Sequence, residues 1–140
     1  MKRIPTVLLL SILFFTSCSS NDKKADVKKD KYDQTAATLE DTEKKNPSRF
    51  LSVGGHDRKN LIRQTVIIGT VTNNAKICSY KDVDVELAFY SKTGTLLEKD
   101  HEMVYEAIAP GKTVSFKTKY YAPKGTDSVA LTILDAKGEK

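Results

Sequence analysis

The sequence predicts an all-β fold, an immunoglobulin-like antiparallel β-sandwich of six to seven strands, in residues 49–140 of a 140-residue chain. Three observations support this. Residues 82–90 alternate between inward apolar and outward side chains, the period of a strand with one buried face. Turn-forming residues recur every eight to twelve positions along this part of the chain. Its length is close to the ~100 residues of such a sandwich.

The stretch 82–90 is the clearest strand. Its expected buried face comprises Val83, Val85, Leu87 and Phe89. Its expected outer face comprises Asp84, Glu86, Ala88 and Tyr90. A turn follows at residues 91–94, because Gly94 can adopt a positive φ without steric cost. We expect residues 95–105 to return as the partner strand of a hairpin.

Two strands are expected before this hairpin. The first is short, residues 50–53, and ends in a turn at Gly54 and Gly55. The second covers residues 61–71, where apolar side chains occupy both faces and predict cover on both sides. Gly69 inside it suggests a bulge or a close backbone approach. Asparagines at 73 and 74 then mark a turn.

Two strands are expected after the hairpin. Pro110 and Gly111 form the clearest turn signal, since Pro presets φ and Gly takes the following left-handed position. Residues 113–121 alternate again, and Val129 begins the apolar alternation of the last strand. If 113–121 lies beside 82–90, the outward Lys117 and Lys119 would pair with Asp84 and Glu86 across the sheet.

The first 17 residues read as a targeting segment. Lys2 and Arg3 precede an apolar run that is shorter than the ~20 residues needed to span a bilayer. The run ends in Phe15-Thr16-Ser17-Cys18, which resembles a bacterial lipobox, although such motifs usually have Leu where Phe15 stands. The resemblance implies that Cys18 becomes the first mature residue and carries a diacylglycerol thioether and an N-acyl chain such as palmitate.

Lipidation would determine the cellular location of the protein. Several acyl chains exceed the two-signal threshold for stable membrane anchoring. The alternative is an ordinary signal peptide cut near Ser17, with Cys18 incidental. Because Ser19 rather than Asp follows the cysteine, lipobox rules imply the bacterial outer membrane. Only Asp22, and no acidic run, precedes Lys23, so the protein is expected to face the periplasm.

Residues 18–48 are expected to be the lipid anchor and a flexible tether. Few large apolar side chains occur there, so the segment cannot bury enough surface to offset its conformational entropy. A short helix over residues 34–45 is compatible with the sequence but has no apolar stripe. As a flexible coil of thirty residues, the tether would reach ~30 Å.

Net charge says little about the partner. The chain carries +5, and residues 49–140 contain fourteen basic and eleven acidic residues. We interpret this small excess as an ordinary solvated surface, neither a nucleic-acid stripe nor a polybasic membrane patch. No nucleic-acid partner is therefore expected.

A family resemblance covers residues 62–121. It rests on Gly69-Thr70-Val71-Thr72-Asn73, the strand 83–90, Thr93-Gly94, and Pro110-Gly111 with Phe116. These residues resemble the FxLYD-type domain, an immunoglobulin-like sandwich of secreted and lipid-anchored bacterial proteins. Here Leu87-x-Phe89-Tyr90-Ser91 stands where Phe-x-Leu-Tyr-Asp would, so the turn Asp is replaced. The resemblance implies no active site.

Catalytic or metal-binding chemistry is not predicted, and no cofactor or metal is expected. Cys78 would be the one remaining thiol and is expected to be a half-buried structural residue, with an intermolecular or redox role as the alternative. His56 and His101 lack metal-ligand spacing, and His56 is expected in a polar loop beside Asp57. The acidic residues 82, 84 and 86 suggest calcium, but more simply form a solvated strand face.

The remaining signal is a contact surface. Tyr90 and Tyr121 fall on predicted outward faces near Lys117 and Lys119, and Tyr is enriched where proteins touch partners. The alternative is aromatic cover for a sandwich edge. We expect a non-catalytic binding or scaffolding module with a protein or glycan partner, or else a structural accessory subunit of an envelope complex.

Overall fold

The computed structural model describes the backbone of residues 22–139 and the side chains of residues 31–139. The predicted signal peptide and the lipidation residue Cys18 lie outside the described residues. Within the described residues, two helices precede six strands, in the order α1 (Asp22–Lys45), α2 (Pro47–Phe50), β1 (Leu51–Lys59), β2 (Thr65–Asn73), β3 (Ser79–Ser91), β4 (Leu96–Val104), β5 (Thr113–Tyr120) and β6 (Thr126–Glu139).

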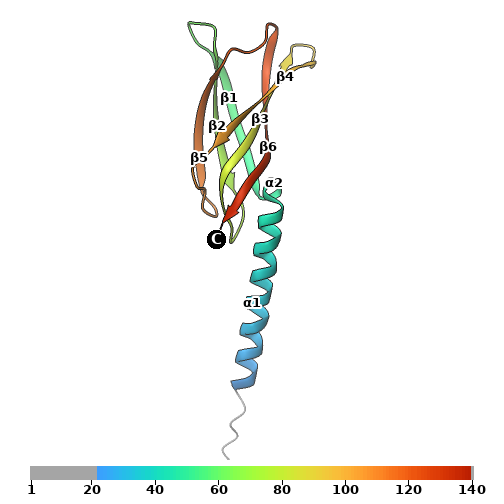
Figure 1. The fold of residues 1–140 in the computed structure, drawn as a ribbon, viewed down its shortest axis with the longest axis vertical. Coiled ribbons are helices and arrows are strands. Elements are labelled where there is room, and N and C mark those ends of the chain that lie inside the picture. Colours follow the sequence, from blue (N-terminus) through green and yellow to red (C-terminus); the bar gives the residue numbers. More distant parts are fainter. Residues whose placement is uncertain (1–21, 140) are drawn as a thin grey trace, which may run out of the picture.

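The strands form the predicted immunoglobulin-like sandwich. One antiparallel sheet has the order β1-β2-β5 and the other has the order β4-β3-β6. These correspond to strands A-B-E and C′-C-F of an immunoglobulin-like domain. In Figure 1, α1 projects away from one end of the sandwich.

The core lies between the sheets, and β3 supplies its centre. The four predicted inward residues, Val83, Val85, Leu87 and Phe89, are all at most 1% exposed. The other sheet contributes Ile67 and Val71, and the largest buried ring is that of Tyr80. The predicted turns at Gly94 and Gly111 are also confirmed, since these residues have φ of 78° and 72°.

The predicted strand neighbours are wrong. Strand β3 pairs with β4 and β6, whereas β5 pairs with β2 in the opposite sheet. Lys117 and Lys119 therefore cannot pair with Asp84 and Glu86 across a sheet. Charge alternation alone did not determine strand order, because each exposed strand face carries charge whatever its neighbour is.

Strand β1 runs through the glycines that the sequence predicted as a turn. Gly55 is directly opposite Gly69 in the β1-β2 ladder. A Cβ on Gly55 would lie 2.6 Å from the Ile68 carbonyl oxygen and 2.9 Å from Leu131 Cδ1. Gly55 therefore permits the close approach of β1 to β2 and to Leu131. As a consequence of the longer strand, His56 lies in β1, not in the predicted loop.

Two further boundaries differ from prediction. Strand β2 begins at Thr65, and Leu61 and Ile62 belong to the exposed loop before it. Residues 22–45 form a helix rather than the predicted flexible coil. Its last turn packs on the sandwich through buried Glu43, a contact that local composition does not reveal. That residues 18–48 connect an anchor to the domain stays a prediction.

Candidate functional site

The four residues predicted as a contact surface do not form one surface. Lys117 and Lys119 lie on the outer side of β5, and the exposed Tyr121 directly follows that strand. Tyr90 is in β3, in the opposite sheet, and is only partly exposed. The structure thus keeps Lys117, Lys119 and Tyr121 together and separates Tyr90 from them.

The outer side of sheet β1-β2-β5 presents a group of basic side chains, which we call the basic face (His56, Arg58, Lys117 and Lys119). The ladder places Ile68 between His56 and Lys117, and Val66 between Arg58 and Lys119. Val66 is 3% exposed although it lies on this outer side. Such burial fits long cationic side chains that lay their aliphatic stems over an apolar residue.

The two sheets carry opposite charge. Strands β1, β2 and β5 contain four Lys or Arg and a single acid, Asp57. Strands β3, β4 and β6 contain nine acids and three lysines. The small net charge of the domain therefore results from two unequal sheets and not from an even mixture of charges.

The three lysines of the acidic sheet all have carboxylate partners within the protein. Lys99 contacts Glu86 at 3.0 Å, Lys137 contacts Asp82 at 2.8 Å, and Lys81 pairs with Glu139. His101 Nδ1 donates to Asp84 over 3.0 Å. In contrast, no Lys or Arg of β1, β2 or β5 forms an ion pair with any described carboxylate. The cations of the basic face are thus free to meet an external anion.

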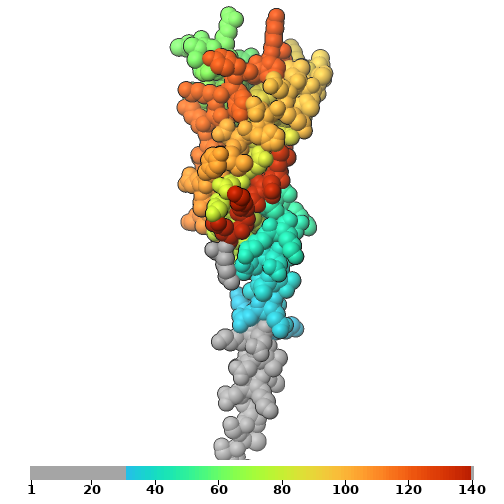
Figure 2. Space-filling model, viewed as in Figure 1, coloured from blue at the N-terminus to red at the C-terminus, as the bar shows by residue number. Residues whose placement is uncertain are grey.

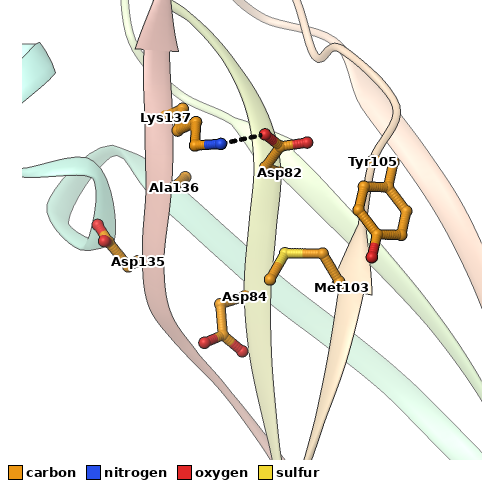
Figure 3. Close-up of a pocket in the computed structure, with 7 residues that line it drawn as sticks. All are labelled: Asp82, Asp84, Met103, Tyr105, Asp135, Ala136 and Lys137. Atoms are coloured by element: carbon orange, nitrogen blue, oxygen red, sulfur yellow. Dashed lines mark hydrogen bonds and ion pairs between the residues drawn. The ribbon is translucent and has the colours of Figure 1, made fainter.

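A shallow hollow of about 260 Å³ lies on the acidic sheet (Figure 3). Its lining includes Asp82, Asp84, Asp135, Met103 and Tyr105. Asp82 points toward Lys137, and the carboxylate of Asp135 lies apart from the other two (Figure 3). Within the described residues, no group of three His, Cys, Asp or Glu side chains is placed to hold a metal ion.

The three acidic residues that suggested a calcium site instead form side-chain contacts within their own sheet. Asp82, Asp84 and Glu86 each bind a different cationic or imidazole side chain of β4 or β6. Their partners are not Lys117 and Lys119, as the sequence suggested, because those lysines belong to the other sheet. Asp82 also adopts a positive φ of 49°, at a point where the β3-β6 register shifts.

Glu43 joins helix α1 to the sandwich, a role that no sequence pattern predicts. Its carboxylate accepts three backbone N–H groups, from Lys76 at 2.8 Å, Ile77 at 3.0 Å and Cys78 at 2.8 Å. Its carbonyl oxygen accepts the hydroxyl of Tyr80 at 2.8 Å. Burial raises the pKa of Glu43, but the N–H donors and the Lys76 charge outweigh it and leave that pKa below its ordinary value.

Cys78 lies beside this contact and is fully buried, not half-buried as predicted. Burial raises the pKa of its thiol above the ordinary value, which disfavours the reactive thiolate. Burial together with the charges of Cys78 and Glu43 also raises the pKa of Tyr80 to about 12. These groups behave as packed structural residues at neutral pH.

Comparisons with family models, with curated proteins and with solved structures find no match to this chain. Among the helices of the described part, none is long and apolar enough to cross a membrane.

Proposed function

We propose that this chain is a lipid-anchored, non-catalytic binding or scaffolding module of the bacterial cell envelope. In this proposal Cys18 carries the lipid, and the basic face contacts an acidic protein or glycan. The observation that carries the proposal is the basic face itself, with its unpaired cations and an apolar residue between them.

Electrostatics favours this face over the opposite one. An incoming anion meets cations that need not first give up an internal partner, whereas Lys99 and Lys137 are already bound to carboxylates. Complementary charge speeds encounter and selects partners more than it raises affinity. Ile68, half-buried between His56 and Lys117, offers apolar area for a closer contact.

Crosslinking in intact envelopes tests the contact. We expect the full chain to capture a partner, and Lys117→Glu with Lys119→Glu to reduce that capture at least tenfold, with strong dependence on salt. Lys31→Glu with Lys92→Glu makes the same change of charge at exposed sites away from the basic face. Equal capture by both double variants would contradict the proposal.

The anchor is tested separately. Cys18→Ser should leave the protein unlipidated and release it from membranes into the soluble fraction of the envelope. The measurement is detergent phase partitioning together with mass spectrometry of the mature N-terminus. Unchanged partitioning of the variant would refute acylation, and separation of the two membranes would test the predicted outer-membrane location.

A structural accessory subunit is the second candidate. Strand β6 is fourteen residues long and, in the part of the chain that the structure describes, pairs only with β3, so its other edge is available in part to a partner strand. A stoichiometric complex that survives high salt would favour this candidate. Salt-sensitive capture would favour the binding module. Membership of the FxLYD-type group remains part of the proposal, which the sandwich fold supports.

A further inference from the structure

The end of the sandwich remote from α1 exposes two large apolar residues. Leu61 is 104% exposed and Ile62 is 64% exposed, both in the loop between β1 and β2. In Figure 2 this loop and the β5-β6 loop, green and red-orange, project at the end farthest from α1. Apolar side chains held out at a loop tip are unfavourable in water, so they indicate a contact.

Cations surround the base of these loops. A hollow of about 380 Å³ lies between them, and its charged lining consists of Lys59, Arg63 and Lys124. Among the residues that the structure describes, no acidic one lines it. None of the three cations forms an ion pair within the described chain. The hollow is therefore suited to an anionic group such as a phosphate.

Both walls of the hollow are held by internal hydrogen bonds. The Asn60 side chain accepts from the backbone N–H groups of Ile62 and Gln64 at 3.1 and 2.9 Å, and donates to the Gln64 side chain. On the other wall, the hydroxyl of Thr126 donates to the Pro123 carbonyl at 2.8 Å. The site is thus formed before any ligand arrives.

Arg63 occupies a backbone conformation that suits glycine. Its φ is 60°, in the left-handed region, where a side chain is disfavoured. A Gly or Asn at this position would fit the turn with less strain. An arginine placed here at a conformational cost suggests that its guanidinium is used, because strained residues concentrate at functional sites.

We propose that this end docks on an anionic phospholipid surface. We define the docking tip as Lys59, Leu61, Ile62, Arg63 and Lys124. Leu61 and Ile62 enter the headgroup boundary, and the three cations bind lipid phosphates, the combination by which peripheral proteins hold anionic membranes. A soluble acidic glycan would account for the cations but not for two apolar residues held out in water.

The docking tip differs from the proposed anchor and from the basic face. Helix α1 leaves the opposite end of the sandwich (Figure 1), so the tip is a second contact on another part of the molecule. It goes beyond the proposed function and requires neither acylation of Cys18 nor the cations of β5.

The test uses the full chain with Ile62→Cys carrying an environment-sensitive fluorophore, reconstituted in neutral phosphatidylcholine vesicles. Cys78 is buried and should not be labelled in the folded protein, and Cys18, where it is not acylated, is changed to serine so that position 62 carries the label. Acceptor vesicles contain phosphatidylcholine with or without phosphatidylglycerol. We expect a blue shift of the fluorophore emission only with acceptor vesicles that contain phosphatidylglycerol. In a second measurement, energy transfer between labelled lipids of the two vesicle populations should report their docking.

Two variants of the unlabelled chain test the components. Leu61→Ser with Ile62→Ser should lower vesicle docking at least about tenfold, as expected from loss of two buried apolar side chains. Arg63→Gly should weaken docking without lowering the thermal midpoint, because glycine relieves the left-handed strain. Tyr32→Ser with Tyr105→Ser is the control. It removes two large side chains elsewhere, each 75% exposed, and should leave docking unchanged.

Three outcomes would overturn the proposal. The first is equal docking on neutral and anionic vesicles, and the second is docking unaffected by the Leu61 and Ile62 substitutions. The third is full competition by soluble polyglutamate, which would identify an acidic macromolecule as the ligand instead of a membrane. The control Lys31→Gln with Lys112→Gln, away from the tip, should behave as the unsubstituted protein.

Discussion

At the scale of single residues, Glu43 is expected to contribute strongly to stability. Glutamine has only one acceptor oxygen, so Glu43→Gln leaves a buried N–H of Lys76, Ile77 or Cys78 without a full partner. We predict a loss of about 2–4 kcal/mol in the free energy of unfolding, measured by urea denaturation. Asp41→Asn, at an exposed position of the same helix, is the control and should change little.

The contribution of Glu43 should depend on pH. Its folded pKa is lowered from the ordinary value of 4.5, so the unfolded chain takes up the proton first as the pH falls. The stabilisation is complete above the unfolded pKa and is lost as pH falls through the folded pKa. The difference between Glu43 and Glu43→Gln proteins should therefore shrink below about pH 4. A difference that stays constant from neutral to acidic pH would contradict this assignment.

Gly69 is predicted to tolerate no side chain. A Cβ there would lie 2.3 Å from Cζ of Phe116, directly opposite in the β2-β5 ladder. Gly69→Ala should therefore lower the free energy of unfolding by about 1–3 kcal/mol through overpacking. Gly54→Ala is the matched control, because nothing lies within 4 Å of its added Cβ. Equal thermal midpoints for the two variants would argue against close contact at Gly69.

Single residues show what a sequence can and cannot predict. Val83 and Val85 were assigned to the core correctly, because burial on one side of a strand leaves a period-2 pattern in neighbouring residues. Glu43 was missed, because its three N–H partners lie 33–35 positions along the chain and a buried carboxylate looks like any other acid in a polar segment. Pairing that depends on distant backbone has no local pattern.

At the scale of elements, strand interiors were easier to predict than their ends. The hairpin of β3 and β4 follows from alternation and from the turn at Gly94. The end of β1 was misplaced because a glycine pair signals a turn, although here Gly55 allows a close approach to Gly69. The start of β2 was misplaced because apolar Leu61 extends the strand pattern into an exposed loop.

Helix α1 should be separable from the sandwich. The described side chains of α1 add none of the buried residues of the hydrophobic core cluster, and the hydrogen-bonded contact with the sandwich lies in the last turn at Glu43. Ala36→Pro removes a helical hydrogen bond and clashes with the carbonyl of residue 32. We predict a loss of helical signal in far-ultraviolet circular dichroism with little change in the thermal midpoint. Ala36→Ser is the control, and a large drop in midpoint for the proline variant alone would show wider coupling.

At the scale of the whole molecule, strand order determines where charge gathers. The sequence contains fourteen basic and eleven acidic residues after position 48, a balance that suggests a surface with evenly mixed charge. The topology then places β5 beside β2 and places the acid-rich β3, β4 and β6 together. The basic face was therefore unpredictable from composition, since it depends on long-range strand pairing.

This asymmetry predicts that copies of the protein attract one another at low salt. The basic face of one molecule is complementary to the acidic sheet of another, and such head-to-tail contacts need not close into a symmetric oligomer. Static light scattering of the detergent-solubilised chain should show net attraction at low ionic strength. Physiological salt should abolish it, because the screening length falls to ~8 Å. Lys117→Glu with Lys119→Glu should remove the attraction, whereas Lys31→Glu with Lys92→Glu should retain more of it. Attraction that persists at high salt would instead indicate apolar contacts, such as those of Leu61 and Ile62.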